Sequence, residues 1–477
     1  MRWPGFVGGS YTPRSVNVDA ERCINLYPEV VDGGTPAVRS WLIGTPGIKG
    51  FVNFTQELGG PVRALFSMNN RAFAVIGQGF YEFFNDGHGK RWWSMATDGS
   101  PATICSNGTA GNQIFIVSGG RGYIFHTDTN YAETITDENF PYPCSMGAFI
   151  DGYFIGLLAQ SREFRISALE DGMVWEGVDV AQVSTAGDNL RSLAVHHREL
   201  WLFGEQNSHI WYNNGDPLFP FAPLQGTTIE HGILAPYSVV QLDNRLYWLG
   251  ADKLGVGQVW RSDGYTPVRV STHAVEYWLS KRGRLTSAIA YAYQDEGHSF
   301  YVLYVPDAET TFVYDVATGF WHERASWNTD NSQWEPHIGR CHCYAFGRHF
   351  IGARDSGQIF EMSLDFYDED LNLVTSNIEV YSASPSASAS QSASASASRS
   401  TSMSASLSPS RSPSQSPSAS SSLSVSQSSS RSASESSSQS PSLSVSQSPS
   451  LSASVSPSQS PSESPSQSSS MSASASL

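Results

Sequence analysis

The sequence predicts an all-β protein: a β-propeller of six or seven four-stranded blades, with an N-terminal arm and a disordered C-terminal serine-repeat tail. Three observations carry this prediction. A strand-turn-strand unit recurs seven times before residue 382, long helical periodicity is almost absent, and an abrupt change to serine-rich sequence follows. We place the arm at residues 1–47, the propeller at 48–372, a linker at 373–381 and a low-complexity Ser-x repeat at 382–477.

The repeated unit is an apolar, aromatic-rich strand, a short glycine or polar turn, and a second such strand, as is typical of a β-hairpin. The second strands of consecutive units begin 41 to 53 residues apart. A propeller blade needs about 40–50 residues, so this near-constant spacing favours radial repetition over the alternative, an all-β sandwich. The seven hairpins are Phe73–Ile76 with Phe80–Phe84, Ile114–Val117 with Tyr123–His126, Tyr153–Leu158 with Phe164–Ala168, Leu200–Phe203 with Ile210–Asn213, Leu246–Leu249 with Gln258–Ser262, Phe300–Val305 with Phe312–Val316, and Phe350–Ala353 with Ile359–Met362.

Closure of the ring is expected to use the segment Ile48–Phe54. The hairpin that contains Phe350 runs toward the tail after Asp365, so the sequence that follows supplies its outer strand poorly. We predict that Ile48–Phe54 pairs with this last blade and removes the unpaired edge that an open sheet would present. The helical periodicity predicts only one short helix, over His273–Lys281.

The arm and the tail cannot build cores of their own. The arm is rich in Gly, Pro, Asn and Arg, and it either packs on its own propeller or reaches a neighbouring subunit. In the tail, every even-numbered position from Ser382 to Ser476 is serine, and all 13 tryptophans precede it. Neither face of such a repeat is consistently apolar, so burial would not offset the entropy of ordering it. We expect disorder, with a role as a spacer, a modification target or a surface brush.

The charge and the cysteine content argue against a protein that wraps nucleic acid and against a fold held by disulfides. Three arginines and two glutamates lie in the tail, which leaves 25 basic and 42 acidic residues before it and a net charge of −17. A protein that wraps nucleic acid usually has the opposite sign. The five cysteines are scattered without a CxxC pair, which indicates a reducing compartment rather than a disulfide framework. No apolar run predicts a secretory signal or a membrane span.

The sequence predicts no catalytic, cofactor or metal site. Asp151, Glu199, Asp243 and Asp295 fall in turns, where acidic residues are the ordinary solvated choice, so we expect no glycosidase-type carboxylate pair. The protein is therefore predicted not to be an enzyme.

Two histidine motifs are interpreted as structural. Strand alternation sends Cys341 and Cys343 to one face and His342 to the other, which favours two buried cysteines and a histidine on a polar face over a metal site. His196 and His197 occupy a turn between two strands and are expected at the surface.

One dense basic cluster follows the predicted helix and consists of Lys281, Arg282 and Arg284. These side chains could contact DNA or an acidic partner. A solvated loop is the alternative, because three charges give only modest phosphate affinity.

Several long motifs resemble the packaged-DNA stabilisation protein family of short-tailed phages, and the resemblance covers most of residues 1–372. These motifs are of the kind that fixes a fold, and none is catalytic. The chain departs from the family after Val380, where the phage proteins continue with further β structure and this sequence enters the serine repeat. The resemblance rests on residues 8–11, Arg14, Ser15, Asn17, 22–29, 44–47, Ser208, 210–213, Gly215, 219–221, 229–232, 235–238, 260–261, 264–267, 271–274 and 293–327.

The resemblance implies a tail hub below the portal: a homo-oligomeric ring, a hexamer in that family, that extends and helps close the DNA channel, stabilises the packaged genome and opens at ejection. Its implied partners are the portal or adaptor ring and the tail needle or another tail protein, with non-specific proximity to packaged double-stranded DNA and no membrane. The implied location is the virion tail, after synthesis in the host cytoplasm.

A propeller tailspike or adhesin that binds or cleaves host surface glycans is the alternative function. It would show clustered carboxylates and exposed aromatic side chains at one mouth of the propeller. The acidic balance favours the hub, since a wall that repels phosphate lets the genome pass without sticking.

Overall fold

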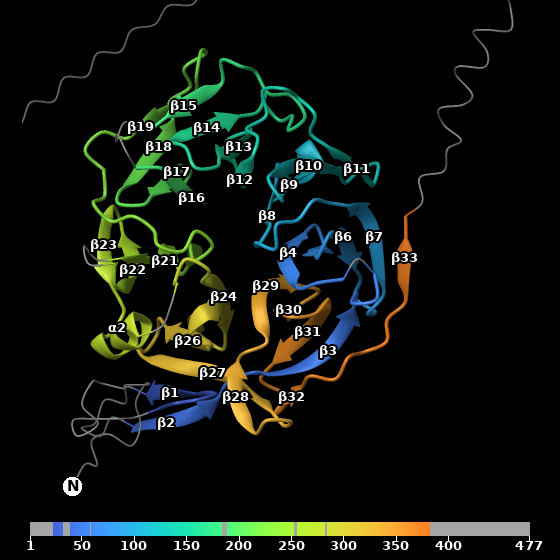
Figure 1. The fold of residues 1–477 in the computed structure, drawn as a ribbon, viewed down its shortest axis with the longest axis vertical. Helices are drawn as coiled ribbons and strands as arrows, with labels where there is room; N and C mark the ends of the chain where they lie inside the picture. Colours follow the sequence, from blue (N-terminus) through green and yellow to red (C-terminus); the bar gives the residue numbers. More distant parts are fainter. Residues whose placement is uncertain are drawn as a thin grey trace, which may run out of the picture. The chain divides into compact units, whose positions relative to one another are not determined.

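Seven sheets follow one another around a central axis (Figure 1). The structure is a computed structural model, and it describes residues 22–31, 39–57, 59–183, 188–251, 255–281 and 284–381. The sheets are the blades of a propeller, which confirms the predicted fold class and sets the number of blades at seven. Every predicted hairpin forms the middle of one blade.

Each blade is assembled from consecutive antiparallel strands, with its first strand nearest the axis. Blades 1 and 7 also receive strands from distant parts of the chain. The consecutive strands of blades 1 to 4 are β4 (Val62–Met68), β5 (Arg71–Ile76), β6 (Gly79–Phe83) and β7 (Gly89–Ser94); β8 (Thr103–Ser106), β9 (Gln113–Ser118), β10 (Arg121–His126) and β11 (Tyr131–Thr134); β12 (Cys144–Ile150), β13 (Tyr153–Leu158), β14 (Glu163–Ile166) and β15 (Val180–Gln182); and β16 (Leu190–His196), β17 (Glu199–Gly204), β18 (Ser208–Asn213) and β19 (Phe221–Pro223). Those of blades 5 to 7 are β20 (Val240–Leu242), β21 (Arg245–Ala251), β22 (Gly257–Asp263) and β23 (Thr266–Arg269); β24 (Ile289–Asp295), β25 (His298–Val305), β26 (Thr310–Asp315), β27 (Trp321–Asn328) and β28 (Gln333–Pro336); and β29 (Gly339–Ala345), β30 (Arg348–Ala353) and β31 (Gln358–Ser363).

The core lies between neighbouring blades rather than in one central layer. Each buried hydrophobic cluster combines residues of two adjacent blades; Phe73 and Phe80 of blade 1, for example, pack on Phe125 of blade 2. Both faces of a blade are therefore covered, and its middle strands are continuously apolar instead of alternating. This explains why the hairpins are recognisable in the sequence.

Helices are few in the described residues. The predicted helix is α2 (His273–Ser280), which Thr272 caps by accepting a hydrogen bond from the Val275 amide. Two single turns, α1 (Gly108–Gly111) and η1 (Pro306–Ala308), lie between strands.

The N-terminal strand β3 (Gly47–Asn53) closes the ring, as predicted. It pairs antiparallel with β31, next to the strand that holds Phe350, and places Ile48 opposite Met362. Ile48 and Val52 are fully buried, one facing blade 6 and the other facing blade 1. The last blade thus takes its fourth strand from the other end of the propeller.

The chain after β31 seals the same edge a second time. Strand β32 (Glu369–Asp370) pairs parallel with β3, and β33 (Ile378–Val380) pairs parallel with β7 of blade 1. Residues 373–381, which we predicted to be a linker, therefore include a strand of blade 1. The Tyr381 amide donates to the Arg91 carbonyl, and its ring packs on Trp92.

The described part of the arm packs on blade 6 of its own propeller. Strands β1 (Leu26–Val31) and β2 (Arg39–Gly44) form a hairpin, and Arg22 binds Glu323 of β27 through two guanidinium nitrogens. Asn25 donates to the Ala325 carbonyl and accepts from the Ala325 amide. Residues 1–21 of the predicted arm and the predicted repeat at 382–477 lie outside the described residues.

A buried histidine joins this hairpin to blade 6. His298 Nε2 lies 2.6 Å from a carboxylate oxygen of Glu29 on β1, and its Nδ1 lies 2.9 Å from Asp315 on β26. Burial lowers the pKa of His298, but the hydrogen bonds to Glu29 and Asp315 outweigh burial and the pKa is raised overall. A protonated His298 can donate to both carboxylates at once.

We expect the stabilisation by Glu29 to depend on pH. Because the folded-state pKa of His298 is raised, this stabilisation is complete below the unfolded value of about 6.5 and is lost as the pH rises through the folded value. Neighbouring His322 and Tyr27 do not titrate in this window, because burial lowers the pKa of His322 to about 3 and raises that of Tyr27 to about 12. Glu29→Gln should lower the free energy of unfolding by about 1–2 kcal/mol near pH 6 and by clearly less near pH 9, as measured by urea unfolding.

Glu361→Gln is the matched control, because Glu361 binds Arg348 and an arginine stays charged throughout this range. Its cost should not change with pH. An equally flat profile for Glu29→Gln would contradict the proposed charge on His298.

Candidate functional site

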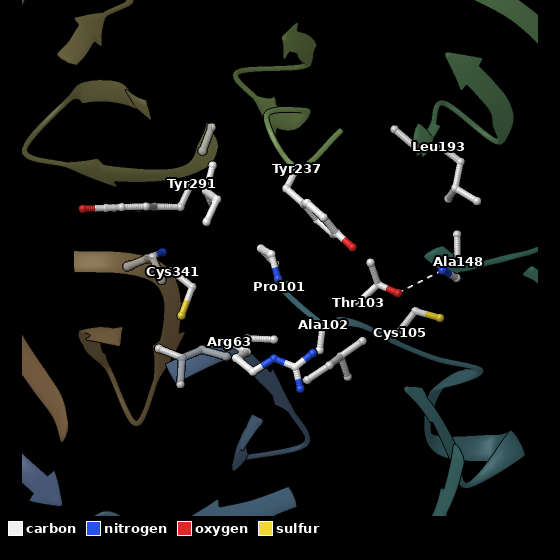
Figure 2. Close-up of a pocket in the computed structure, with 18 of the residues that line it drawn as sticks. Arg63, Pro101, Ala102, Thr103, Cys105, Ala148, Leu193, Tyr237, Tyr291 and Cys341 are labelled. Atoms are coloured by element: carbon white, nitrogen blue, oxygen red, sulfur yellow. Dashed lines mark hydrogen bonds between the residues drawn. The ribbon is translucent and has the colours of Figure 1, made fainter. Parts of the chain in front are cut away.

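A cavity of 430 Å³ lies on the propeller axis and is lined by residues of all seven blades (Figure 2). Small side chains such as Ala64, Ala148 and Ala290 face it from the innermost strands, and Tyr237 extends toward its middle. Burial raises the pKa of Tyr237 to about 12, so its phenol stays neutral. Among the described residues, no aspartate or glutamate lines this cavity, so they provide no glycosidase-type carboxylate pair there.

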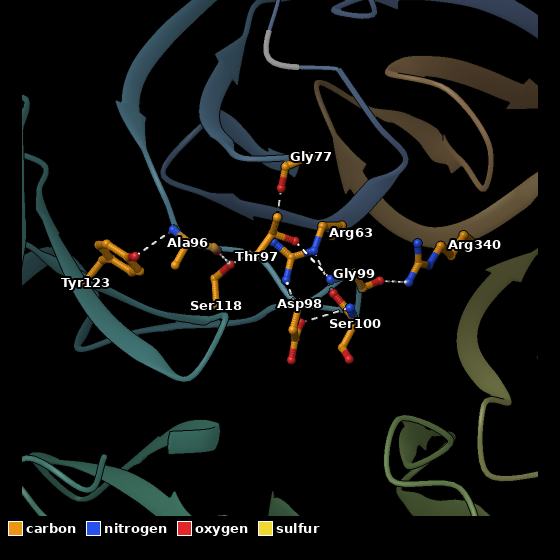
Figure 3. Close-up of polar contacts among 10 residues, drawn as sticks. All are labelled: Arg63, Gly77, Ala96, Thr97, Asp98, Gly99, Ser100, Ser118, Tyr123 and Arg340. Atoms are coloured by element: carbon orange, nitrogen blue, oxygen red, sulfur yellow. Dashed lines mark hydrogen bonds and ion pairs between the residues drawn. The ribbon is translucent and has the colours of Figure 1, made fainter. Parts of the chain in front are cut away.

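Two buried arginines at the edge of this cavity hold the loop that leads from blade 1 to blade 2 (Figure 3). Arg63 donates from Nε to the Ser100 carbonyl at 2.6 Å, and from Nη1 to the Gly77 carbonyl and to Ser118 Oγ. Arg340 of blade 7 donates to the Gly99 carbonyl at 3.2 Å. Burial lowers the pKa of both guanidinium groups. Their polar contacts link blades 7, 1 and 2 around the axis.

Of the four acidic residues singled out in the sequence, Asp151 and Asp243 lie in turns as predicted, whereas Glu199 begins β17 and Asp295 ends β24, so for these two the turn prediction was wrong. None lines the axial cavity. Asp151 accepts a hydrogen bond from Arg198, and Glu199 accepts one from the hydroxyl of Tyr265. Asp243 lies in the turn between β20 and β21, and Asp295 pairs with His298 at the end of the β24–β25 hairpin. They are not brought together into one site.

The Cys341-His342-Cys343 motif has the predicted alternation but not the predicted environment. Both cysteines belong to the cluster between blades 7 and 1, whereas His342 faces blade 6, 3.0 Å from His349. The prediction of a polar face was wrong, because the neighbouring blade covers it; burial lowers the pKa of His342 to about 3. Within the described ranges, no group of three or more His, Cys, Asp or Glu side chains could hold a metal.

The prediction for the second histidine pair was half wrong. His197 is exposed, but His196 is buried and stacks on His197 with ring centroids 3.9 Å apart. The stack covers the end of blade 4 near Trp201.

The predicted basic cluster is only partly described. Lys281 and Arg284 are exposed after α2, with Lys281 Nζ 5.2 Å from the centre of the Tyr277 ring. Arg282 lies outside the described residues.

None of the described helices is long and apolar enough to cross a membrane.

The structure also contains a groove that the sequence analysis missed. Two adjoining hollows of 830 and 940 Å³ lie at the outer edge of blades 6 and 7, between the base of the β1–β2 hairpin, the β27–β28 hairpin and the segment after β31. Trp327 and Trp334 face each other across β27 and β28 with ring centroids 5.1 Å apart. This rim groove comprises Asn25, Leu26, 43–49, Glu296, Ala325, Trp327, Thr329, Trp334 and 364–372.

A family model described as "Bacteriophage P22 Gp10, beta-propeller", of the phage stabilisation family, matches residues 6–367. The chain belongs to this family. The phage stabilisation family consists of virion structural proteins, so this chain is a structural component of a phage particle rather than a member of an enzyme family. No curated protein matches the sequence.

Solved propellers resemble this chain in fold. Selenomethionine-substituted virginiamycin B lyase from Staphylococcus aureus is 11% identical with a TM-score of 0.46, covering 67% of this chain and 99% of that one. Streptogramin B lyase is 8% identical with a TM-score of 0.42, covering 71% and 98%. The RRP9 WD40 repeats are 9% identical with a TM-score of 0.40, covering 67% and 99%. Likenesses at this level carry no argument about function.

Arg63 should be worth more to stability than Arg340. Replacing Arg63 with Met removes three hydrogen bonds, two of them fully buried, whereas Arg340→Met removes one part-buried bond. We expect Arg63→Met to lower the free energy of unfolding by about 3 kcal/mol or more, and Arg340→Met by about 1–2 kcal/mol, in urea titrations of the full chain. Equal losses in the two variants would contradict the larger role of Arg63 in holding the loop between blades 1 and 2.

Proposed function

We propose that this protein is a tail-hub subunit of a short-tailed phage, which assembles as a ring below the portal, extends the DNA channel and helps retain the packaged genome. The observation that carries the proposal is the family match over residues 6–367 on a propeller closed by strands from both ends. The tail position, the hexameric ring and the attachment of a tail needle or its substitute are parts of this proposal.

The hub acts through its shape. Packed protein interiors have low compressibility, and here each blade is clamped between two others, so a ring of such propellers makes a stiff wall. The axial cavity of 430 Å³ is the size of a small-molecule pocket, too small for a DNA duplex to pass through one propeller. A channel for the genome therefore requires several subunits around it.

The net negative charge of the chain favours passage of the DNA over binding of the DNA. The chain carries 28 basic and 44 acidic residues, so most of a channel wall made from it would repel phosphate and let the genome slide at ejection.

Assembly on the portal is the decisive test. The full chain should be measured by light scattering alone and after mixing with the portal or adaptor ring encoded beside it. We expect a monomer that becomes a stoichiometric ring, near six copies, only on its own portal; the portal of an unrelated phage serves as the control. A stable trimer that ignores the portal would refute the hub and support the receptor-binding or glycan-degrading alternative.

The basic loop is proposed to provide a local phosphate contact beside the channel. Lys281→Ala with Arg284→Ala should reduce the slope of log affinity against log salt by about 1–2 for a short DNA duplex, measured by fluorescence anisotropy. Arg121→Ala with Arg198→Ala is the matched control, because it removes the same charge from exposed arginines of other blades. Equal changes in the two pairs would mean that only the net charge matters.

A further inference from the structure

The rim groove has the exposed aromatic surface of a binding site. Trp327 and Trp334 are each 46% exposed and Tyr367 is 97% exposed, although all three are large enough to fill a core. Tryptophan and tyrosine dominate the centres of protein interfaces, because they bury much area while losing few rotatable bonds. The three side chains surround one groove rather than being scattered over the surface.

The groove is also acidic. Its lining includes five carboxylates, of Glu296, Asp365, Asp368, Glu369 and Asp370, against one cation, Lys49. Over the described ranges, Asp365, Asp368 and Asp370 form no ion pair. A matching partner would carry positive charge together with aromatic side chains.

The chain itself contains such a segment. Residues 1–18 include Arg2 and Arg14 and the aromatic residues Trp3, Phe6 and Tyr11, and no acidic residue occurs before Asp19. We propose that residues 1–18 of a second copy of the chain bind in the rim groove and link neighbouring subunits. This inference rests on the proposed ring.

The direction of the chain favours a second copy over the same one. Ile24 forms a parallel bridge to Glu323, so residues 22–25 run alongside β27 toward Trp327 and the groove. Arg22 therefore lies about 10 Å farther from the groove than Asn25, for an extended chain of three residues. To fill the groove of its own subunit, the segment would have to turn back past Arg22. A segment that comes from outside needs no reversal.

The experiment places the photo-crosslinking residue p-benzoylphenylalanine at position 327 of the full chain. Equal amounts of ¹⁴N- and ¹⁵N-labelled protein are mixed, alone and on the portal ring, and the cross-linked peptides are identified by mass spectrometry. We expect mixed-isotope cross-links between position 327 and residues 1–18. The same residue at position 218, where Leu218 is 84% exposed on blade 4, should give none.

Competition and groove variants test the chemistry. Excess synthetic peptide of residues 1–18 should suppress the cross-link, and a peptide with Arg2→Glu and Arg14→Glu should not. Asp365→Asn with Asp368→Asn should weaken peptide binding by up to about tenfold, and Trp334→Ala should weaken it by about thirtyfold. Leu218→Ala should leave it unchanged.

The outcomes separate this inference from the hub proposal. A ring on the portal without cross-links to residues 1–18 overturns the inference and leaves the hub standing. If no ring forms but position 327 cross-links specifically to the synthetic peptide of residues 1–18, the hub is refuted. The groove is then supported as the binding site of this segment. Cross-links between peptides of the same isotope alone overturn the proposal that the segment comes from a second copy. Binding of a host polysaccharide in the groove that the peptide cannot displace overturns the proposal that residues 1–18 occupy it.

Discussion

The structure depends on the pairing of β3 with β31. A propeller blade has two apolar faces, and each must be covered by a neighbouring blade, so a ring with one incomplete blade would expose both a hydrophobic face and an unpaired strand edge. Here the seventh blade obtains its fourth strand from residues that precede the first blade. Ile48 and Val52 then fill the interfaces on both sides of that strand, so closure and burial occur together.

Polar contacts reinforce this closure where the chain crosses between blades. Arg324 of β27 donates to the Pro46 carbonyl just before β3, and the Asn53 side chain at the end of β3 donates to the Val374 carbonyl of the C-terminal segment. On the axis, Arg63 and Arg340 bind carbonyls of one loop from blades 1 and 7. A buried guanidinium has several donors in a fixed geometry, so one side chain can satisfy several main-chain acceptors that no strand pairs. These contacts surround the point at which the ring is joined.

The sequence was sufficient for the hairpins, the short helix and the closing strand, because these follow from local pattern and from counting strands. It was insufficient wherever an adjacent blade determines whether a side chain is buried or exposed. His342 alternates correctly with Cys341 and Cys343, but only the packing of blade 6 makes its face buried. The reverse holds for Trp327 and Trp334, whose aromatic strand pattern is typical of a core. Both are about half exposed, Trp327 near the end of β27 and Trp334 on β28, the fifth strand of blade 6.

The arrangement of the chain ends separates the axis from the rim. Around the axis, the lining is small, apolar or used in internal hydrogen bonds, and no described end of the chain lies there. Arg22 is fixed on the outer strand β27 of blade 6, and Tyr381 on the outer strand β7 of blade 1. The two ends of the described chain therefore both lie at the rim, Arg22 on blade 6 beside the rim groove and Tyr381 on blade 1 (Figure 1). The axis thus holds a cavity lined mainly by small and apolar side chains, whereas the exposed Trp327, Trp334 and Tyr367 lie at the rim groove of blades 6 and 7.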